Sequence, residues 1–192
     1  MTADVPWGEA NVLSTTHEIE EFCTVVQSEL ADHSILLKVE IDGMHSDHAK
    51  NRSADPSRYV EMKTMWKYPR NRRINNFRRR KYMEHWAHAF IAGVEDNVYG
   101  LKDDNGIVTE VEVLKTHQLP RLSENFWYPE DLIHSLDSFL TLLKNAVTQD
   151  NPNVVYKFDC TPEEIKCTEM CNPEEKYKLI PEWYVREYNE NF

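Results

Sequence analysis

The sequence predicts an α/β (α+β) protein in which helices flank a mixed β-sheet. Two kinds of periodicity support this prediction. Hydrophobic residues alternate with charged residues over residues 35–42 and 59–65, the pattern of strands with two different faces. Over residues 128–149 hydrophobic residues recur at helical spacing. Because strand-like and helix-like segments are interspersed along the chain, we expect a sheet packed against helices.

The first half of the chain is expected to begin with a helix. Thr15-Thr16-His17-Glu18 has the S/T-x-x-E form of a capping box, and hydrophobic residues follow it at helical spacing, so we expect a helix over about residues 16–31. The two alternating strands come next, with a polar loop between them. A second hydrophobic stripe predicts a helix over about residues 74–92, and Gly93 provides its C-terminal stop.

The second half is expected to contain a hairpin, a long helix and two short strands. Residues 98–114 form two strand-like segments around Asp104-Asn105-Gly106, and Asn-Gly favours the positive φ angles of a tight turn. The long helix over residues 128–149 follows. Strands are expected at residues 154–158 and 177–180, with an acidic loop between them.

Length and composition indicate one intracellular domain spanning residues 1–192. The chain contains no Gly/Ser-rich linker, no signal-peptide core at its start and no apolar run long enough to cross a bilayer. We therefore expect a nuclear or cytoplasmic protein without a membrane segment. Its four cysteines are expected to be reduced thiols.

The distribution of charge is more informative than the total. A net charge of −11 argues against nucleic acid as a partner, because phosphate binding depends on Lys and Arg. Yet seven of the 22 basic residues lie in one short segment that contains no acid: Arg70, Arg72, Arg73, Arg78, Arg79, Arg80 and Lys81. Taken alone, this basic patch is explained by a solvated helix start. Directly after a site for phosphate chemistry, it suits contact with a nucleic-acid backbone.

Four charged residues suggest such a site. Glu40 and Asp42 are two apart on one expected strand, and Glu61 and Lys63 are two apart on the next. If these strands pair, three carboxylates and one ammonium group converge. Carboxylates held together require a cation, and oxygen ligands suit Mg²⁺ or Mn²⁺. Without other support, a solvated charged face remains the alternative explanation.

The chain also resembles the DXO decapping exoribonuclease family. The resemblance is carried by residues 34–43 (SILLKVEIDG), 59–64 (YVEMKT), 77–102 (FRRRKYMEHWAHAFIAGVEDNVYGLK) and 180–186 (IPEWYVR), and it spans nearly the whole chain. It implies a restriction-endonuclease-like (D/E)xK nuclease core. It also implies Mg²⁺- or Mn²⁺-dependent removal of NAD-type, triphosphate or incomplete caps from RNA 5′ ends, often with 5′-to-3′ degradation.

The resemblance assigns roles residue by residue. The family's Glu-x-Asp motif falls on Glu40 and Asp42, and its Glu-x-Lys motif falls on Glu61 and Lys63, so these are the implied catalytic residues. Glu40, Asp42 and Glu61 would bind the metal, together with the main-chain carbonyl of Met62.

Substrate contacts are implied for Cys23, Glu40, Lys63 and His88. Cys23 matches a position beside the bound nucleotide. His88 stands where family members usually have the Gln of a Trp-Ala-Gln motif, and it can still donate a hydrogen bond. Val39 replaces the Gly that usually precedes Glu-x-Asp.

A further departure concerns the start of the chain. The family's domain begins well upstream, and its first half supplies an Arg that binds substrate and a Glu that completes the metal site. The sequence is thus expected to correspond to the second half of the domain, truncated at the N-terminus. The alternative to an active enzyme is a catalytically impaired relative that binds RNA or a partner protein. A 5′-to-3′ exoribonuclease is the partner that the resemblance suggests.

Two other metal sites are weaker hypotheses. The loop over residues 42–48 (DGMHSDH) contains His and Asp residues that could hold Zn²⁺ or iron, although a solvated loop explains it as well. Cys167 and Cys171 lack a convincing second pair at metal-ligand spacing, so ordinary thiols are expected there.

Overall fold

The computed structural model describes most of the chain in two compact units, divided between Pro129 and Glu130. The described residues are 21–45, 56–67, 71–151, 153–177, 183–184 and 186–187, without the side chains of residues 71–73 and 175. Each unit is considered by itself, and the expectation of a single domain stays a prediction.

The first described element is a β-hairpin, so the helix expected over residues 16–31 is wrong for its second half. β1 (Cys23–Leu30) pairs antiparallel with β2 (His33–Glu40), and a two-residue turn joins them, with a positive φ of 48° at Ala31. Residues 16–20 lie outside the described residues. Val25 and Val26 are β-branched and favour a strand, and along β1 exposed side chains alternate with partly buried ones.

The second sheet is mixed, as predicted. It contains β3 (Gly43–Met44), β4 (Tyr59–Trp66), β5 (Asp96–Lys102) and β6 (Val108–Lys115), in that order. β4 and β5 are parallel, whereas the two outer pairs are antiparallel. The segment from β4 to β5 must therefore cross over the sheet, and it does so through helices.

The expected pairing of residues 35–42 with residues 59–65 is wrong. β2 ends at Glu40 and pairs with β1 alone, whereas the strand that pairs with β4 is the two-residue β3. The link between β2 and β3 is Ile41-Asp42, so Asp42 is not part of a strand shared with Glu40. The Ile41 side chain is buried, and its backbone N–H donates to the carbonyl of Phe22 at 2.9 Å.

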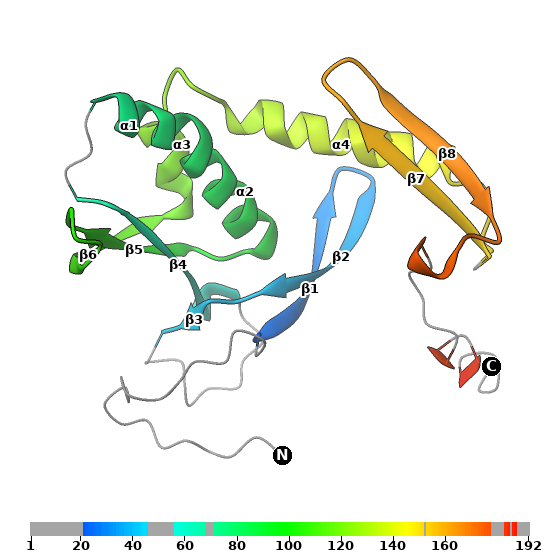
Figure 1. Cartoon of the computed structure of the whole chain (residues 1–192), viewed down its shortest axis with the longest axis horizontal. Coiled ribbons are helices and arrows are strands. Elements are labelled where there is room, and N and C mark those ends of the chain that lie inside the picture. The colour runs from blue at the N-terminus through cyan, green and yellow to red at the C-terminus, as the bar shows by residue number, and fades with distance from the viewer. Residues whose placement is uncertain are drawn as a thin grey trace. The chain divides into compact units, whose positions relative to one another are not determined.

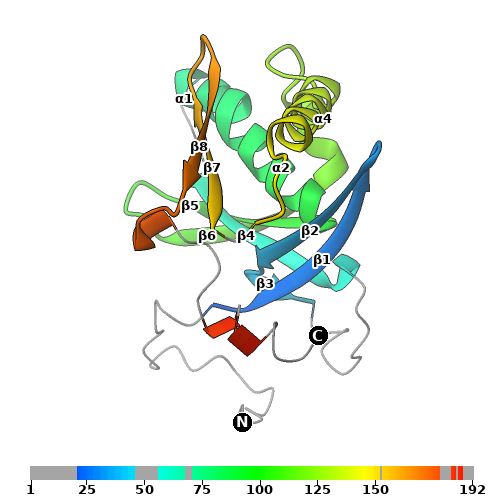
Figure 2. The same ribbon diagram turned by 90° about the vertical axis from the view of Figure 1, so that its right-hand side faces the viewer.

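The helix expected over residues 74–92 is present and begins slightly earlier. α1 (Asn71–Asn76), a π-helical segment (Phe77–Lys81) and α2 (Tyr82–Ala92) follow one another, and Gly93 ends α2 with a positive φ of 71°, as predicted. α1 and α2 lie over one face of the mixed sheet (Figures 1 and 2). A 3-10 turn (Pro56–Arg58) precedes β4. A second (Thr116–Gln118) and α3 (Leu119–Leu122) follow β6.

The hydrophobic core of this unit joins α2 to β4. Its buried members are Ile41, Tyr59, Ala89, Ala92 and Val94, with Val39 and Met44 packed against them. Tyr59, Glu61, Lys63 and Met65 alternate along β4 and share one face. The charged pair therefore lies on the face that α2 covers, whereas Met62 on the opposite face is 53% exposed.

The hairpin between β5 and β6 confirms the turn predicted at residues 104–106. Gly106 has a φ of 83°, and its backbone N–H donates to the Asp103 carbonyl at 3.0 Å. The Asp103 carboxylate accepts hydrogen bonds from the backbone N–H groups of Asn105 and Ile107, at 2.9 and 3.0 Å. Local side-chain chemistry thus fixes this turn.

The second unit pairs a helix with a hairpin. α4 (Pro129–Ala146) confirms the long helix, and β7 (Val154–Cys160) confirms the strand expected at residues 154–158. The acidic loop expected after β7 is wrong over β8 (Ile165–Cys171), which pairs with β7. A 3-10 turn (Glu175–Tyr177) follows, and the rest of the strand expected at 177–180 lies outside the described residues. None of the described helices combines the length and apolar character needed to cross a bilayer.

The two glycines with positive φ predict different costs of substitution. At Gly93 an added Cβ would lie 3.2 Å from the Cβ of Pro56, whereas at Gly106 nothing lies within 4 Å. Gly106→Ala should lower the free energy of unfolding by about 1 kcal/mol through backbone strain alone. Gly93→Ala adds a steric contact to the same strain, so we expect a loss of about 2 kcal/mol. Urea denaturation measures both, and equal losses would contradict the role of Pro56.

Candidate active site

The register between β3 and β4 brings two of the predicted acidic residues, Asp42 and Glu61, together. Gly43 pairs with Val60, so Asp42, one residue earlier, lies opposite Glu61. The Asp42 carboxylate accepts a hydrogen bond from the backbone N–H of Met62 at 2.8 Å. Asp42 and Glu61 therefore meet at the edge of β4 although they are far apart in sequence, as the sequence suggested.

Lys63 joins the two carboxylates. Its ammonium group lies 2.6 Å from Glu61 and 3.0 Å from Asp42. The Glu61 side chain is only 6% exposed, and a buried carboxylate without a cation would be strongly disfavoured. Partial burial by itself would lower the pKa of Lys63, but hydrogen bonds to Glu61 and Asp42 outweigh it and raise the pKa above its usual value. The two carboxylates thus hold Lys63 between them as a cation.

Glu40 does not join this group. It is the last residue of β2, its side chain is exposed, and its register partner is Cys23 at the start of β1. The three predicted carboxylates thus do not form one cluster: among the described residues, no group of three His, Cys, Asp or Glu side chains could hold a metal. The implied roles of Glu40, Cys23 and the Met62 carbonyl stay predictions.

Part of the basic patch lies on the surface beside α2. Arg79, Arg80 and Lys81 are exposed, and Lys81 pairs with Glu84 at 2.7 Å. Arg78 is half-buried, and its backbone carbonyl accepts a hydrogen bond from the indole N–H of Trp127 at 3.0 Å. Arg70 and the side chains of Arg72 and Arg73 lie outside the described atoms. His88, the predicted phosphate contact, is an exposed residue of α2.

Sequence reasoning missed a polar pair under α2. Tyr99 on β5 is 0% exposed, and its hydroxyl lies 3.0 Å from Nδ1 of His85 on α2. Burial, together with a smaller effect of the nearby charge of Lys63, lowers the pKa of His85 to about 4. Burial also raises the pKa of Tyr99. Both side chains are therefore neutral near pH 7. The helical spacing of His85 with the buried Tyr82 and Ala89 could have indicated its position.

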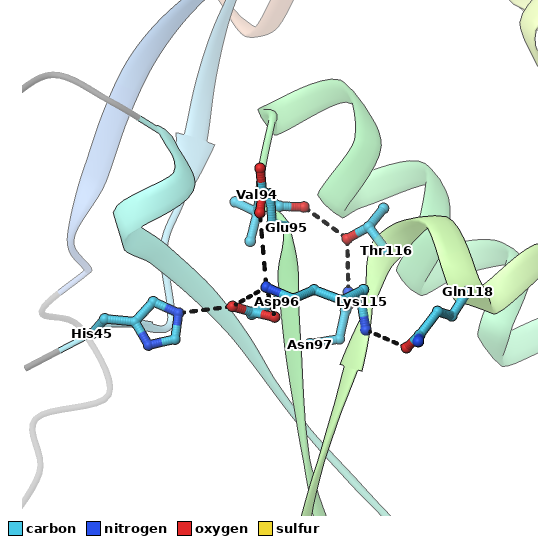
Figure 3. Close-up of polar contacts among 8 residues, drawn as sticks. All are labelled: His45, Val94, Glu95, Asp96, Asn97, Lys115, Thr116 and Gln118. Carbon is cyan, nitrogen blue, oxygen red and sulfur yellow. Dashed lines mark hydrogen bonds and ion pairs between the residues drawn. The ribbon is translucent and has the colours of Figure 1, made fainter.

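A second polar group fastens the start of β5 (Figure 3). The buried Asp96 carboxylate lies 2.8 Å from the ammonium of Lys115 and 2.9 Å from Nε2 of His45. Burial alone would raise the pKa of Asp96, but these hydrogen bonds lower it below its usual value. Thr116 continues the group by donating to the Val94 carbonyl at 2.7 Å. His45, the residue directly after β3, is thus tied to β5.

The two weaker metal hypotheses gain no support from these positions. His45 is engaged with Asp96, and residues 46–48 of the proposed loop site lie outside the described residues. Cys167 and Cys171 are exposed free thiols on β8. Neither segment contributes a group of metal ligands within the part of the chain that the structure describes.

Comparison with known proteins identifies the family of this chain. The family model for RAI1-like PD-(D/E)XK nucleases matches residues 1–185. The chain belongs to this family. Membership of the RAI1-like nuclease family confirms the resemblance and the (D/E)xK nuclease core predicted from the sequence. Glu61-Met62-Lys63 on β4 has the form of the E-x-K motif, and its role in that core stays a prediction.

Relatives and solved structures agree with this assignment. The decapping and exoribonuclease protein of Xenopus laevis is 29% identical over 191 residues, which are 97% of this chain and 47% of that protein. Rai1 of Scheffersomyces stipitis, solved with (3′-NADP)⁺ and calcium, has the same fold. It matches with a TM-score of 0.80 and 21% identity over 90% of this chain and 46% of that one. Rai1 of Candida albicans, solved with pU5 and Mn²⁺, matches with a TM-score of 0.72 and 20% identity over 79% and 42%.

The chain spans about half the length of the RAI1-like relatives it matches. The fold and family therefore apply to this chain directly, whereas the activity, substrates and partners of the whole relatives do not transfer automatically. Among its own residues, the RAI1-like core places Asp42, Glu61 and Lys63 together and a neutral His–Tyr pair beneath α2.

The low pKa of His85 predicts that the free energy of unfolding depends on pH. In the unfolded chain this histidine binds a proton below about pH 6.5, whereas the folded protein resists protonation until about pH 4. Stability should therefore fall as the pH drops through this window. Between pH 7 and pH 4.5 the loss from His85 is expected to be about 2 kcal/mol. His85→Phe keeps a ring but cannot titrate, so its stability should depend less on pH.

Urea denaturation at the two pH values measures this difference. His117→Phe is the matched control, since His117 is exposed on a 3-10 turn of the same unit. The control should lose as much stability as the unchanged protein on acidification. A His85→Phe variant with the same acid sensitivity as the unchanged protein would contradict the assignment.

Proposed function

We propose that this chain carries a divalent-cation-dependent hydrolase site that acts on RNA 5′ ends. Its reactions would be removal of NAD-type, triphosphate or incomplete caps, with 5′-to-3′ exoribonuclease activity on the resulting end. The observation that carries the proposal is the meeting of Asp42 and Glu61 around Lys63. This is the arrangement expected of a (D/E)xK nuclease core, the family to which the chain belongs.

The residues of the site fit Mg²⁺ or Mn²⁺. Both are hard cations that prefer oxygen ligands, and Mg²⁺ usually binds through one or two carboxylates while keeping several waters. Asp42 and Glu61 supply two carboxylates, and the Met62 carbonyl and Glu40 are further candidates. The fit agrees with the calcium and Mn²⁺ named for the solved relatives. A cation bound here would lower the pKa of a coordinated water and offset charge on a phosphoryl oxygen.

The side chains would divide the work of hydrolysis. The oxygen of a water molecule bonds to phosphorus, the bond from phosphorus to the departing oxygen breaks, and one proton passes from the water to the leaving group through solvent. Asp42 and Glu61 would hold the cation. Lys63 would hold the scissile phosphate or orient the water by charge and hydrogen bonding.

RNA 5′ ends are proposed from two independent features. The relatives include decapping nucleases and exoribonucleases, and one solved relative holds pU5. In this chain, the exposed Arg79, Arg80 and Lys81 immediately precede α2, which covers the face that bears Glu61 and Lys63. Cationic side chains beside a phosphate-binding site favour a nucleic-acid backbone.

A non-catalytic RNA-binding relative is the second candidate. It is favoured by the absence, among the described residues, of a group of three side chains that could hold a metal. It would bind RNA through the basic patch without turnover. Association with a 5′-to-3′ exoribonuclease and nuclear or cytoplasmic residence also stay predictions, because no described residue argues for a particular partner or compartment.

Removing one carboxylate distinguishes the two candidates. Glu61→Gln keeps the shape of the side chain but removes a cation ligand and a partner of Lys63. We expect Mn²⁺-dependent release of the cap from NAD-capped or triphosphate RNA to fall by about a hundredfold, which corresponds to roughly 3 kcal/mol of transition-state stabilisation. The rate is measured on 5′-labelled RNA with the purified chain.

Glu124→Gln is the control for this experiment. Glu124 is exposed and lies after α3, outside the site, so its substitution should leave the rate unchanged. Equal rates for Glu61→Gln and the unchanged chain would show that this glutamate has no part in hydrolysis. If the unchanged chain binds RNA but never cleaves it, the second candidate is correct.

The basic patch predicts how RNA binding depends on salt. Replacing Arg79, Arg80 and Lys81 by Gln removes three exposed cations. If each contacts one phosphate of single-stranded RNA, the slope of log K against log salt should shrink by about 2. The affinity should fall similarly for all sequences. Fluorescence anisotropy at several salt concentrations measures the slope, and an unchanged slope would exclude this segment from the RNA interface.

A further inference from the structure

The His85–Tyr99 pair lies beside the proposed active site. Tyr99 is the register partner of Lys63 on the neighbouring parallel strand, so the two side chains leave the same face of the sheet. His85 reaches Tyr99 from α2, which covers that face. Among the charged groups near His85, the Lys63 ammonium lowers its pKa most. The imidazole thus contacts the register partner of Lys63, the residue that joins Asp42 to Glu61.

The tautomer of His85 follows if the Tyr99 hydroxyl donates the hydrogen bond that joins them. The buried Tyr99 hydroxyl remains a phenol, and its proton requires an acceptor. Within the described part of the chain, Nδ1 of His85 is the partner that the structure gives this hydroxyl, at 3.0 Å. A neutral imidazole that accepts at Nδ1 carries its proton on Nε2. His85 is therefore a neutral donor with one N–H still to place.

Surrounding rings hold this pair in one orientation. Phe77 packs edge-on against both members, with ring centroids 5.8 Å from His85 and 6.5 Å from Tyr99. Tyr82 packs edge-on against Tyr99 at 5.8 Å. Side chains fixed by packing lose little further freedom when they bind a ligand. The donor is thus pre-organised before substrate arrives.

A phosphate at the site needs such a donor. Lys63 has three N–H groups, and two of them are already directed to Glu61 and Asp42. The lysine alone therefore offers at most one hydrogen bond to a phosphate that has several acceptor oxygens. A neutral donor beside Lys63 can bind a phosphoryl oxygen without adding a positive charge that would compete with a bound cation.

We propose that His85, held by Tyr99 as the Nε2–H tautomer, donates a hydrogen bond to the RNA phosphate bound beside Lys63. The proposal rests on the proposed function, because it names a further residue of the same site. Tyr99 is then a positioning residue that acts through His85. The exposed His88, one turn further along α2, is a separate position whose contact remains to be tested.

Binding of RNA without turnover tests this assignment directly. The probe is 5′-phosphorylated pentauridylate in the presence of Ca²⁺, with the dissociation constant measured by calorimetry on the purified chain. His85→Phe keeps the ring contacts but has no N–H, so we expect binding to weaken by about tenfold or more. His85→Gln restores a donor and should bind within about threefold of the unchanged chain. His117→Phe, at an exposed histidine outside the site, is the control for loss of an imidazole.

Nitrogen NMR of the free protein provides a second readout that a packing role would not produce. At pH 7 the ¹⁵N shifts of His85 should show the Nε2–H tautomer, and Tyr99→Phe should give a mixture of tautomers while the fold persists. The same Tyr99→Phe variant should bind the oligonucleotide a few-fold more weakly. A predominant Nδ1–H tautomer in the unchanged protein overturns the proposal.

The binding results also separate this inference from the proposed function. If the unchanged chain binds in a Ca²⁺-dependent manner and Glu61→Gln weakens that binding, the site is correct. In that case, two results would overturn the role of His85 alone. The first is a His85→Phe variant that binds RNA as tightly as the unchanged chain. The second is a His85→Gln variant that binds RNA no more tightly than His85→Phe. If the unchanged chain shows no cation-dependent binding, the proposed function fails and the role of His85 fails with it.

Discussion

The arrangement of this site depends on one ammonium group between two carboxylates. Asp42 and Glu61 would repel each other at the edge of β4, and Glu61 is almost fully buried, so the pair is tolerable only with a cation nearby. Lys63 supplies that cation from the same strand as Glu61. The two-residue β3 is therefore important beyond its length, because its pairing with β4 places Asp42 where Lys63 can reach it.

The rest of the first unit keeps these groups in place. α2 covers the face of the sheet that carries Glu61 and Lys63, and its residues Ala89 and Ala92 share a core with Tyr59 of β4. Ile41, the residue directly before Asp42, is buried in the same core. Asp96 ties His45 and Lys115 together, so the residue that directly follows β3 is joined to β5 and β6 (Figure 3). Small-residue packing and ion pairing thus hold the strands around Glu61 and Lys63 together.

Features set by neighbouring residues were predictable from the sequence, and features set by distant pairing were not. Asn105-Gly106 and Gly93 determine a turn and a helix end through their own backbone preferences, so both were identified. The spacing of Val25, Val26 and Leu30 fits a helix, but cross-strand pairing with β2 decides for a strand. The carboxylate pair was predicted for a partly wrong reason, since β3 and not β2 pairs with β4. His85 was missed because only tertiary contact with Tyr99 gives it a role.

Electrostatics relates the two candidate functions to one quantity, the occupancy of the cation site. Asp42, Glu61 and Lys63 together carry a net charge of −1, which repels a phosphate, whereas a bound divalent cation changes this charge to +1 and attracts it. Cation and phosphate should therefore bind cooperatively, each raising the affinity of the other by the same factor. Under the proposed function, RNA would be attracted only by the basic patch while the cation is absent, and the chain would then act as a binding protein. A bound cation would let the same patch bring RNA to a site that can hydrolyse it, so catalysis and simple binding would be two states of one surface.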